Sequence, residues 1–110
     1  MEEGQKTAMK IKNKNVLGET DIGKLGEFFK VLSETARLRI LSTLLDGGMC
    51  VMHLSEAVKM SQSATSHQLA ILRRANLVKV ARSGKNLIYS ISDEHVRLVL
   101  DMALLHVNEK

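Results

Sequence analysis

Helical periodicity dominates this sequence, and no proline interrupts it. Apolar residues recur at intervals of three and four positions, which is typical of helices that pack along one face. Only two short segments, 77–80 and 87–91, are rich in β-branched residues, and aromatic residues make up only 3% of the chain. Sandwiches and barrels need more such segments, so the sequence predicts a mainly α-helical fold with a small β-hairpin.

Turn and capping residues mark the ends of the predicted elements. Gly47 and Gly48 end the second helix, Ser61 caps the fourth, and Ser92 caps the last. We expect helices at residues 20–32, 34–45, 51–58, 62–75 and 93–108, strands at 77–80 and 87–91, and a loop at 82–86. The resulting order, α-α-α-α-β-β-α, is typical of a winged helix-turn-helix.

Length and composition predict one soluble domain. The 110 residues leave no room for a second domain. Residues 1–18 show little periodicity and are expected to form a mobile arm, which leaves residues 19–110 for the winged helix-turn-helix domain. No apolar run approaches the ~18–20 residues of a membrane span, and no signal peptide is recognisable. A single cysteine is typical of a reducing compartment, so we expect a cytoplasmic protein.

Positive charge is concentrated in one part of the chain. No Asp or Glu occurs between Ala57 and Ser92. The same segment contains six cationic residues: Lys59, Arg73, Arg74, Lys79, Arg82 and Lys85. A nucleic-acid backbone explains this pattern, because cations displace its condensed counterions. The alternative is a basic surface that only improves solubility.

The predicted helix at 62–75 has one polar face. At ~100° per residue, an arc of roughly 140° contains Gln62, Ser63, Ser66, His67, Ala70, Arg73 and Arg74. The remaining face, which we expect to pack, contains Ala64, Thr65, Leu69, Ile71, Leu72 and Ala75. Short Ser and Gln side chains on such an arc suit a helix that lies in the major groove of DNA, and the basic hairpin loop suits phosphate or the minor groove. We therefore predict DNA contacts from Gln62, Ser63, Ser66, His67, Arg73, Arg74, Arg82 and Lys85. His67 could equally be an ordinary solvent-exposed histidine.

Potential metal ligands lie at both ends of the predicted last helix. Asp93 and His95 are at its start, and His106 and Glu109 at its end. The two histidines share a face but are ~16 Å apart along the axis, whereas two ligands of one zinc ion lie ~3–4 Å apart. One chain cannot close such a site, but two antiparallel copies of the helix can close it twice. The alternative is that these residues only stabilise the helix dipole.

The same helix has enough apolar surface for a dimer contact. Its apolar positions are Val96, Val99, Leu100, Ala103, Leu104 and Val107. We expect two chains to pack along this surface as a homodimer.

Three segments resemble the ArsR/SmtB family of metal-sensing winged-helix repressors. They are 33–41 (SETARLRIL), 61–69 (SQSATSHQL) and 93–96 (DEHV), and the resemblance extends from about Leu25 to Glu109. It implies a homodimer that binds an inverted-repeat operator in double-stranded DNA and releases it when metal binds. It further implies that Gln62, Ser63, Ser66 and His67 contact the DNA, and it implies neither a membrane partner nor a small organic substrate.

The resemblance also extends to the zinc site of the family's last helix. That site has the pattern Asp-x-His, a His eleven residues later, and Glu or His three residues further. Asp93, His95, His106 and Glu109 match it position by position. This implies Zn²⁺ or Co²⁺, two ions per dimer, between the subunits, and the donor set suits both metals. The family's second site uses Cys-x-Cys, and we expect it to be absent because Met52 stands where the second thiol would be.

Two other functions remain open. One is a thiol-responsive repressor that acts through Cys50, and the other is a winged-helix DNA-binding protein without metal sensing. We do not expect an enzyme, because no nucleophile–base–acid arrangement is evident. Moreover, four protein ligands would leave no open position on a zinc ion.

Overall fold

The computed structural model describes residues 17–109 of the chain. The chain divides into two compact units, Met1–Lys30 and Val31–Lys110, whose described parts are presented in turn. The predicted mobile arm, residues 1–18, lies outside the described residues except for its last two positions, and the domain boundary at residue 19 stays a prediction. No helix between residues 17 and 109 is both long enough and apolar enough to cross a membrane.

The first unit contains most of α2 (Glu19–Leu32). Two acidic residues, Glu19 and Asp21, lie in its first turn, where carboxylates interact favourably with the helix dipole. The rings of Phe28 and Phe29 meet edge to face, with their centroids 5.1 Å apart. The predicted helix at 20–32 is confirmed to within one residue.

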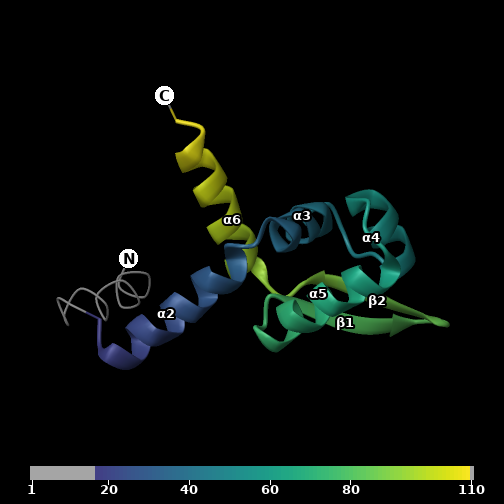
Figure 1. Ribbon diagram of the computed structural model, residues 1–110, viewed down its shortest axis with the longest axis horizontal. Coiled ribbons are helices and arrows are strands. Elements are labelled where there is room, and N and C mark those ends of the chain that lie inside the picture. Colours follow the sequence, from purple (N-terminus) through teal and green to yellow (C-terminus); the bar gives the residue numbers. More distant parts are fainter. Residues whose placement is uncertain (1–16, 110) are drawn as a thin grey trace, which may run out of the picture. The chain divides into compact units, whose positions relative to one another are not determined.

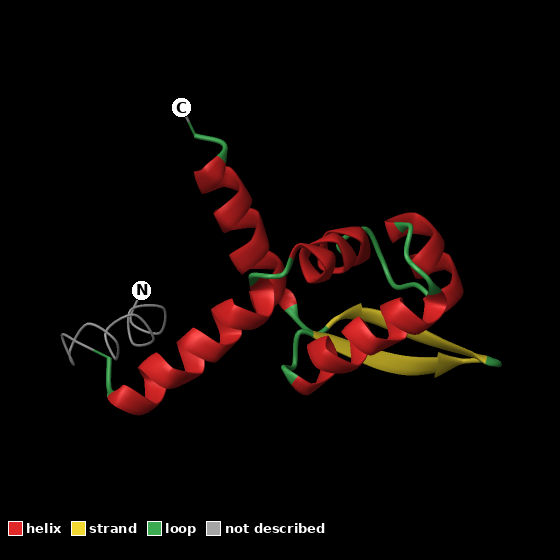
Figure 2. Cartoon of the chain, in the orientation of Figure 1, coloured by secondary structure: helices red, strands yellow, loops and turns green. Residues whose placement is uncertain are grey.

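The second unit is a winged helix-turn-helix. Its elements are α3 (Thr35–Leu44), α4 (Val51–Val58), α5 (Gln62–Arg74), β1 (Val78–Ser83), β2 (Asn86–Ile91) and α6 (Glu94–Val107). The two strands form an antiparallel hairpin beside α5, and α6 follows the hairpin (Figures 1 and 2). With α2 included, the predicted order α-α-α-α-β-β-α is confirmed.

A core of aliphatic side chains joins the three central helices to the hairpin. The helices α3, α4 and α5 contact one another, β1 packs on α5, and β2 contacts α3 and α4. The fully buried aliphatic members are Ile40, Leu41, Leu44, Leu54, Leu69, Leu72 and Leu77. Because burying each such side chain contributes roughly 1.5–3 kcal/mol, this core fixes the position of α5 against the hairpin.

The tip of the hairpin is tighter than predicted. Residues 82–86 do not form a loop, because pairing continues to Ser83 and Asn86 and leaves a turn of only two residues, Gly84 and Lys85. Gly84 has φ +64°, a left-handed conformation that glycine adopts without strain. Two-residue turns with glycine first match the twist of paired strands, which explains the longer hairpin.

The prediction that Ser92 caps the last helix is wrong. Asp93 is the N-cap of α6, and its Oδ1 accepts a hydrogen bond of 3.2 Å from the amide of Val96. Ser92 instead lies against the end of α5: its hydroxyl donates to the carbonyl of Asn76 at 2.6 Å, and its amide donates to the carbonyl of Leu77 at 3.1 Å. A hydroxyl and a carboxylate are both good caps, so the sequence did not distinguish these neighbours.

A third short segment pairs with the hairpin next to a glycine. Met49 and Tyr89 exchange backbone hydrogen bonds of 2.9 and 2.8 Å. At the preceding position, Gly48, a Cβ atom would lie 2.7 Å from Cγ2 of Ile88 and 3.2 Å from the carbonyl oxygen of Tyr89. The close approach of the two backbones therefore requires glycine at this position.

Replacing this glycine should destabilise the fold. We expect Gly48→Ala to lower the free energy of unfolding by about 1–3 kcal/mol, because the added methyl group overpacks the contact with β2. Urea denaturation measures the change. Adding Ile88→Ala, which removes the nearest atom, should make the double variant less destabilised than the sum of the single changes. Additive losses would show that the contact is not the cause.

Candidate nucleic-acid interface and metal-binding helix

The helix α5 is fixed at its start by Ser61. The Ser61 hydroxyl accepts a hydrogen bond of 3.0 Å from the amide of Ala64, as predicted for an N-cap. The buried hydroxyl of Thr65 donates to the Ser61 carbonyl at 2.8 Å. Both bonds satisfy groups that would otherwise lack partners at the helix terminus, so the first turn of α5 is well defined.

The predicted division of α5 into two faces is largely confirmed. Thr65, Leu69 and Leu72 are buried, whereas Ala64, expected on the packed face, is exposed. The seven side chains of the polar arc are all exposed: Gln62, Ser63, Ser66, His67, Ala70, Arg73 and Arg74. Burial of one face against the core thus leaves the opposite face free for a partner.

The acid-free segment folds into α5 and the adjoining hairpin. Lys79, Arg82 and Lys85 are exposed on the hairpin, with Lys85 in the turn at its tip. No acidic side chain is available between Ala57 and Ser92 to neutralise these cations. The recognition helix and the hairpin therefore share a positive potential suited to a polyanion.

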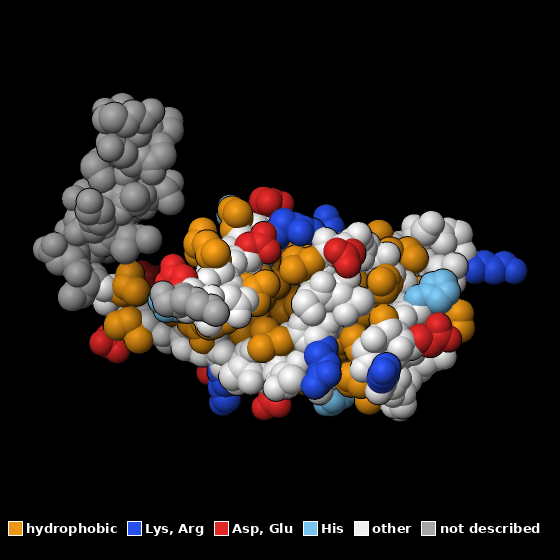
Figure 3. Space-filling model, turned by 90° about the horizontal axis from the view of Figure 1, so that it is seen from above, with side chains coloured by type: hydrophobic (Ala, Val, Ile, Leu, Met, Phe, Trp, Pro, Cys, Tyr) orange, Lys and Arg blue, Asp and Glu red, His pale blue; other side chains and the backbone are white. Residues whose placement is uncertain are grey.

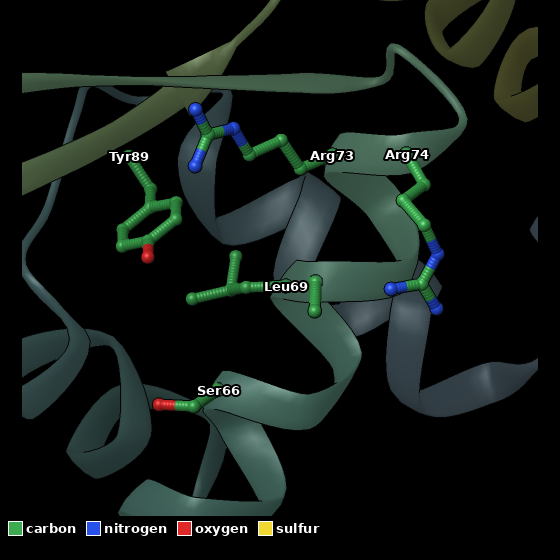
Figure 4. A pocket seen from close by; sticks show the side chains of 6 residues that line it. Ser66, Leu69, Arg73, Arg74 and Tyr89 are labelled. Carbon is green, nitrogen blue, oxygen red and sulfur yellow. The ribbon is translucent and has the colours of Figure 1, made fainter.

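A hollow of about 440 Å³ separates α5 from β2. Its lining residues are Ser66, Leu69, Ala70, Arg73, Arg74 and Tyr89. Figure 4 shows the guanidinium of Arg73 extended toward Tyr89, while Arg74 points away on the other side of the helix. Tyr89 was missed in the sequence because it appears there only as an aromatic strand residue. Its register opposite Val80, on the side of the sheet that packs on α5, is what brings it to the hollow.

The predicted metal ligands form two separate pairs on α6. Nδ1 of His95 lies 3.6 Å from Oδ1 of Asp93, and Nδ1 of His106 lies 3.6 Å from Oε1 of Glu109. All four side chains are at least 54% exposed. Between residues 17 and 109, no three His, Cys, Asp or Glu side chains come together within one chain. The structure thus brings together the members of each pair but not the two pairs.

Each pair has the spacing of half a zinc site. Two ligands of one tetrahedral zinc ion lie ~3–4 Å apart, and the donor atoms within both pairs are 3.6 Å apart. Oδ1 of Asp93 also caps α6, but a carboxylate has a second oxygen that can bind a metal. The residues present therefore fit Zn²⁺ or Co²⁺, provided that a second chain supplies the other pair.

The outer half of α6 is exposed and apolar. Its most exposed apolar side chains are Leu98, Met102, Leu104, Leu105 and Val107, between 52% and 72% accessible, and hydrophobic side chains reach the surface on the face seen in Figure 3. A groove of about 420 Å³ between α3 and α6 is lined by Leu38, Leu45, Leu100, Ala103, Leu104 and Val107, among others. Val96, predicted for the dimer contact, is instead buried within its own chain.

Two hydrogen bonds hold the base of α6 against the helix-turn-helix. Ser92 donates to the end of α5, as described above, and the guanidinium of Arg97 donates to the Leu45 carbonyl at the end of α3. The pair Asp93 and His95 lies beside these two anchors in the sequence. The start of α6 is therefore connected to the turn that follows α5.

Cys50 and His53 form no comparable site. Cys50 is the N-cap residue of α4 without a side-chain capping bond, and it is half-buried rather than fully buried. His53 is exposed on the same helix. Neither belongs to a group of three or more His, Cys, Asp or Glu side chains within residues 17–109.

The chain resembles known regulators in sequence. Residues 34–80 match the family described as "Bacterial regulatory protein, arsR family". A transcriptional repressor SmtB homolog of Synechocystis sp. is 43% identical over 86 residues, which are 78% of this chain and 65% of that protein. A cadmium resistance transcriptional regulatory protein CadC homolog of Staphylococcus aureus is 34% identical over 90 residues, 81% of this chain and 72% of that protein. The match thus spans slightly less than two thirds of the Synechocystis relative.

Solved structures share the fold. The homodimeric winged helix-turn-helix DNA-binding domain of Mb0332 from Mycobacterium bovis superposes with a TM-score of 0.77 at 26% sequence identity. The match covers 82% of this chain and 83% of that one. Fold, family model and relatives agree that the chain belongs to the arsR family of bacterial regulatory proteins, which are transcriptional regulators rather than enzymes.

Proposed function

We propose that this chain is a cytoplasmic transcriptional repressor that binds double-stranded operator DNA as a homodimer and releases it when Zn²⁺ or Co²⁺ binds between the last helices. The observation that supports this most directly is the pairing of two features in one unit. An acid-free recognition surface lies on α5 and the hairpin, and two half-sites for metal lie on α6, joined to the end of α5 through Ser92.

The DNA contacts follow from the exposed positions. Gln62, Ser63, Ser66 and His67 lie in the first turns of α5, where a recognition helix in the major groove reaches base edges. The cationic side chains Arg73, Arg74, Arg82 and Lys85 contact phosphates, and the hairpin tip reaches the minor groove. A symmetric dimer places two such helices ~34–36 Å apart, which corresponds to an inverted repeat.

The exposed apolar side chains of α6 favour a second copy of this chain as partner. Contiguous apolar surface of this kind is uncommon on a monomer. Antiparallel pairing of two α6 helices places His106 and Glu109 of one chain beside Asp93 and His95 of the other, which gives two four-donor sites per dimer. No small organic substrate is needed for this function.

Metal would act at the place where α6 meets the recognition helix. A bound ion supplies a cross-link between chains that fixes how the two α6 helices are arranged. In this chain, Ser92 and Arg97 hold the start of α6 to the ends of α5 and α3, so the spacing of the two recognition helices depends on that arrangement. A switch from 1:99 to 99:1 requires about 5.5 kcal/mol of differential affinity between the two arrangements.

Two substitutions on the DNA surface should have different effects. We expect Lys85→Ala to weaken binding of all DNA sequences and to reduce the slope of log affinity against log salt by about 2, because the dimer carries the change in both subunits and neutralises two phosphates fewer. Gln62→Ala should instead reduce discrimination between sequences while the salt slope is unchanged. Fluorescence anisotropy on a duplex selected by the protein from a randomised pool measures both effects. An unchanged salt slope for Lys85→Ala would contradict the phosphate contact.

Removing one metal ligand should separate DNA binding from regulation. We expect His106→Ala to bind the selected duplex as tightly as the unchanged protein without metal, but to stay bound when Zn²⁺ is added. Its zinc affinity should fall by at least about 100-fold, since loss of even an outer partner of a ligand costs 10–100-fold. Competition with a chromogenic chelator measures the zinc affinity and the stoichiometry. We expect two ions per dimer for the unchanged protein.

His53→Ala is the matched control, because His53 is an exposed histidine outside α6. It should respond to Zn²⁺ like the unchanged protein. Release of DNA by His106→Ala on addition of Zn²⁺ would show that the metal site is wrong. Loss of regulation in Cys50→Ser would favour the thiol-responsive alternative, and DNA binding that no metal alters would favour a protein without metal sensing.

A further inference from the structure

We propose that the hollow between α5 and β2 binds one backbone phosphate of DNA, held by Ser66, Arg73 and Tyr89. The inference rests on the proposed DNA binding and adds a residue, Tyr89, that the sequence pattern does not indicate. It also assigns Ser66 and Arg73 a common ligand in place of separate contacts.

Three polar groups from two elements converge at this hollow. Ser66 and Arg73 are seven residues apart on α5, so they lie two turns apart on nearly the same side of the helix. Tyr89 lies in the middle of β2, paired with Val80, and is half-buried. In Figure 4, the Ser66 hydroxyl, the Arg73 guanidinium and the Tyr89 ring lie on the same side of α5, with Leu69 between them.

These groups have no hydrogen-bonding partner of their own. Within residues 17–109, the side chains of Ser66, Arg73 and Tyr89 make no hydrogen bond and no ion pair. A guanidinium and two hydroxyls offer several donors, and no carboxylate occurs between Ala57 and Ser92 to accept them. An anion with more than one acceptor oxygen suits this set of donors.

The position of the hollow favours a phosphate of the DNA backbone over a base. When a recognition helix lies in the major groove and its hairpin approaches the adjacent minor groove, one sugar–phosphate strand passes between them. The hollow lies between the same two elements, at the edge of the polar arc of α5. Ala70 and Leu69 line the same hollow, which leaves room for a phosphate with its sugar.

The test uses a duplex selected by this protein from a randomised pool, in which each phosphate is replaced in turn by a neutral methylphosphonate. Tyr89→Phe, which keeps the ring, should weaken binding of the unmodified duplex about tenfold per half-site, as expected for a hydrogen bond to a charged group. One methylphosphonate position per half-site should weaken binding of the unchanged protein. On the duplex with a methylphosphonate at that position, Tyr89→Phe should cause no further loss of affinity.

Arg82→Ala is the matched control, because it removes the same charge from an exposed side chain of β1 that does not line the hollow. The loss of binding free energy caused by this control substitution should add to the loss caused by the sensitive methylphosphonate. The losses caused by Arg73→Ala and by the same methylphosphonate should not add. Unchanged binding by Tyr89→Phe, or additive losses at every phosphate, would overturn the phosphate site while DNA binding stands. Failure of the unchanged protein to select any duplex would overturn the proposed function itself.

Discussion

Burial of one face of α5 is the constraint on which the rest of the structure depends. Thr65, Leu69 and Leu72 are enclosed by the core, and this fixes the rotation of the helix about its axis. The polar arc consequently faces outward, and the hairpin is held along the side of the helix. The recognition surface therefore needs no ordering at the moment of binding, which reduces the entropy lost on association.

The position of α6 follows from the same core. Val96 is buried and Arg97 bonds to the carbonyl of Leu45, so the first turns of α6 are attached to the helix-turn-helix. Beyond these turns, every residue from Asp101 to Glu109 is exposed. A helix that is attached at one end and apolar at the other is incomplete without a partner. That contrast allows one helix to contribute to the core and to offer its outer part to the proposed dimer contact.

The sequence predicted the helices and strands well because the periodicity of their apolar residues is strong. All five helices and both strands occur where the apolar pattern and the caps place them, and the faces of α5 were predicted correctly except at Ala64. Two of the differences have a common cause. The burial of Val96 and the convergence of Tyr89 with Arg73 depend on which elements lie side by side, and no local pattern contains that information. The separation of the proposed metal ligands into two pairs could be predicted because the rise of a helix is fixed.

The hairpin turn of Gly84 and Lys85 limits how this fold can change. Because only Gly84 and Lys85 remain unpaired at the tip, an inserted residue on one strand would shift every later side chain of that strand to the opposite face of the ribbon. Lengthening is tolerated only by matched additions, one on each strand, and each such step moves the tip outward by ~3.4 Å. The length of the hairpin can therefore change only in steps of one residue pair, and the position of Lys85 in its turn changes by the same steps.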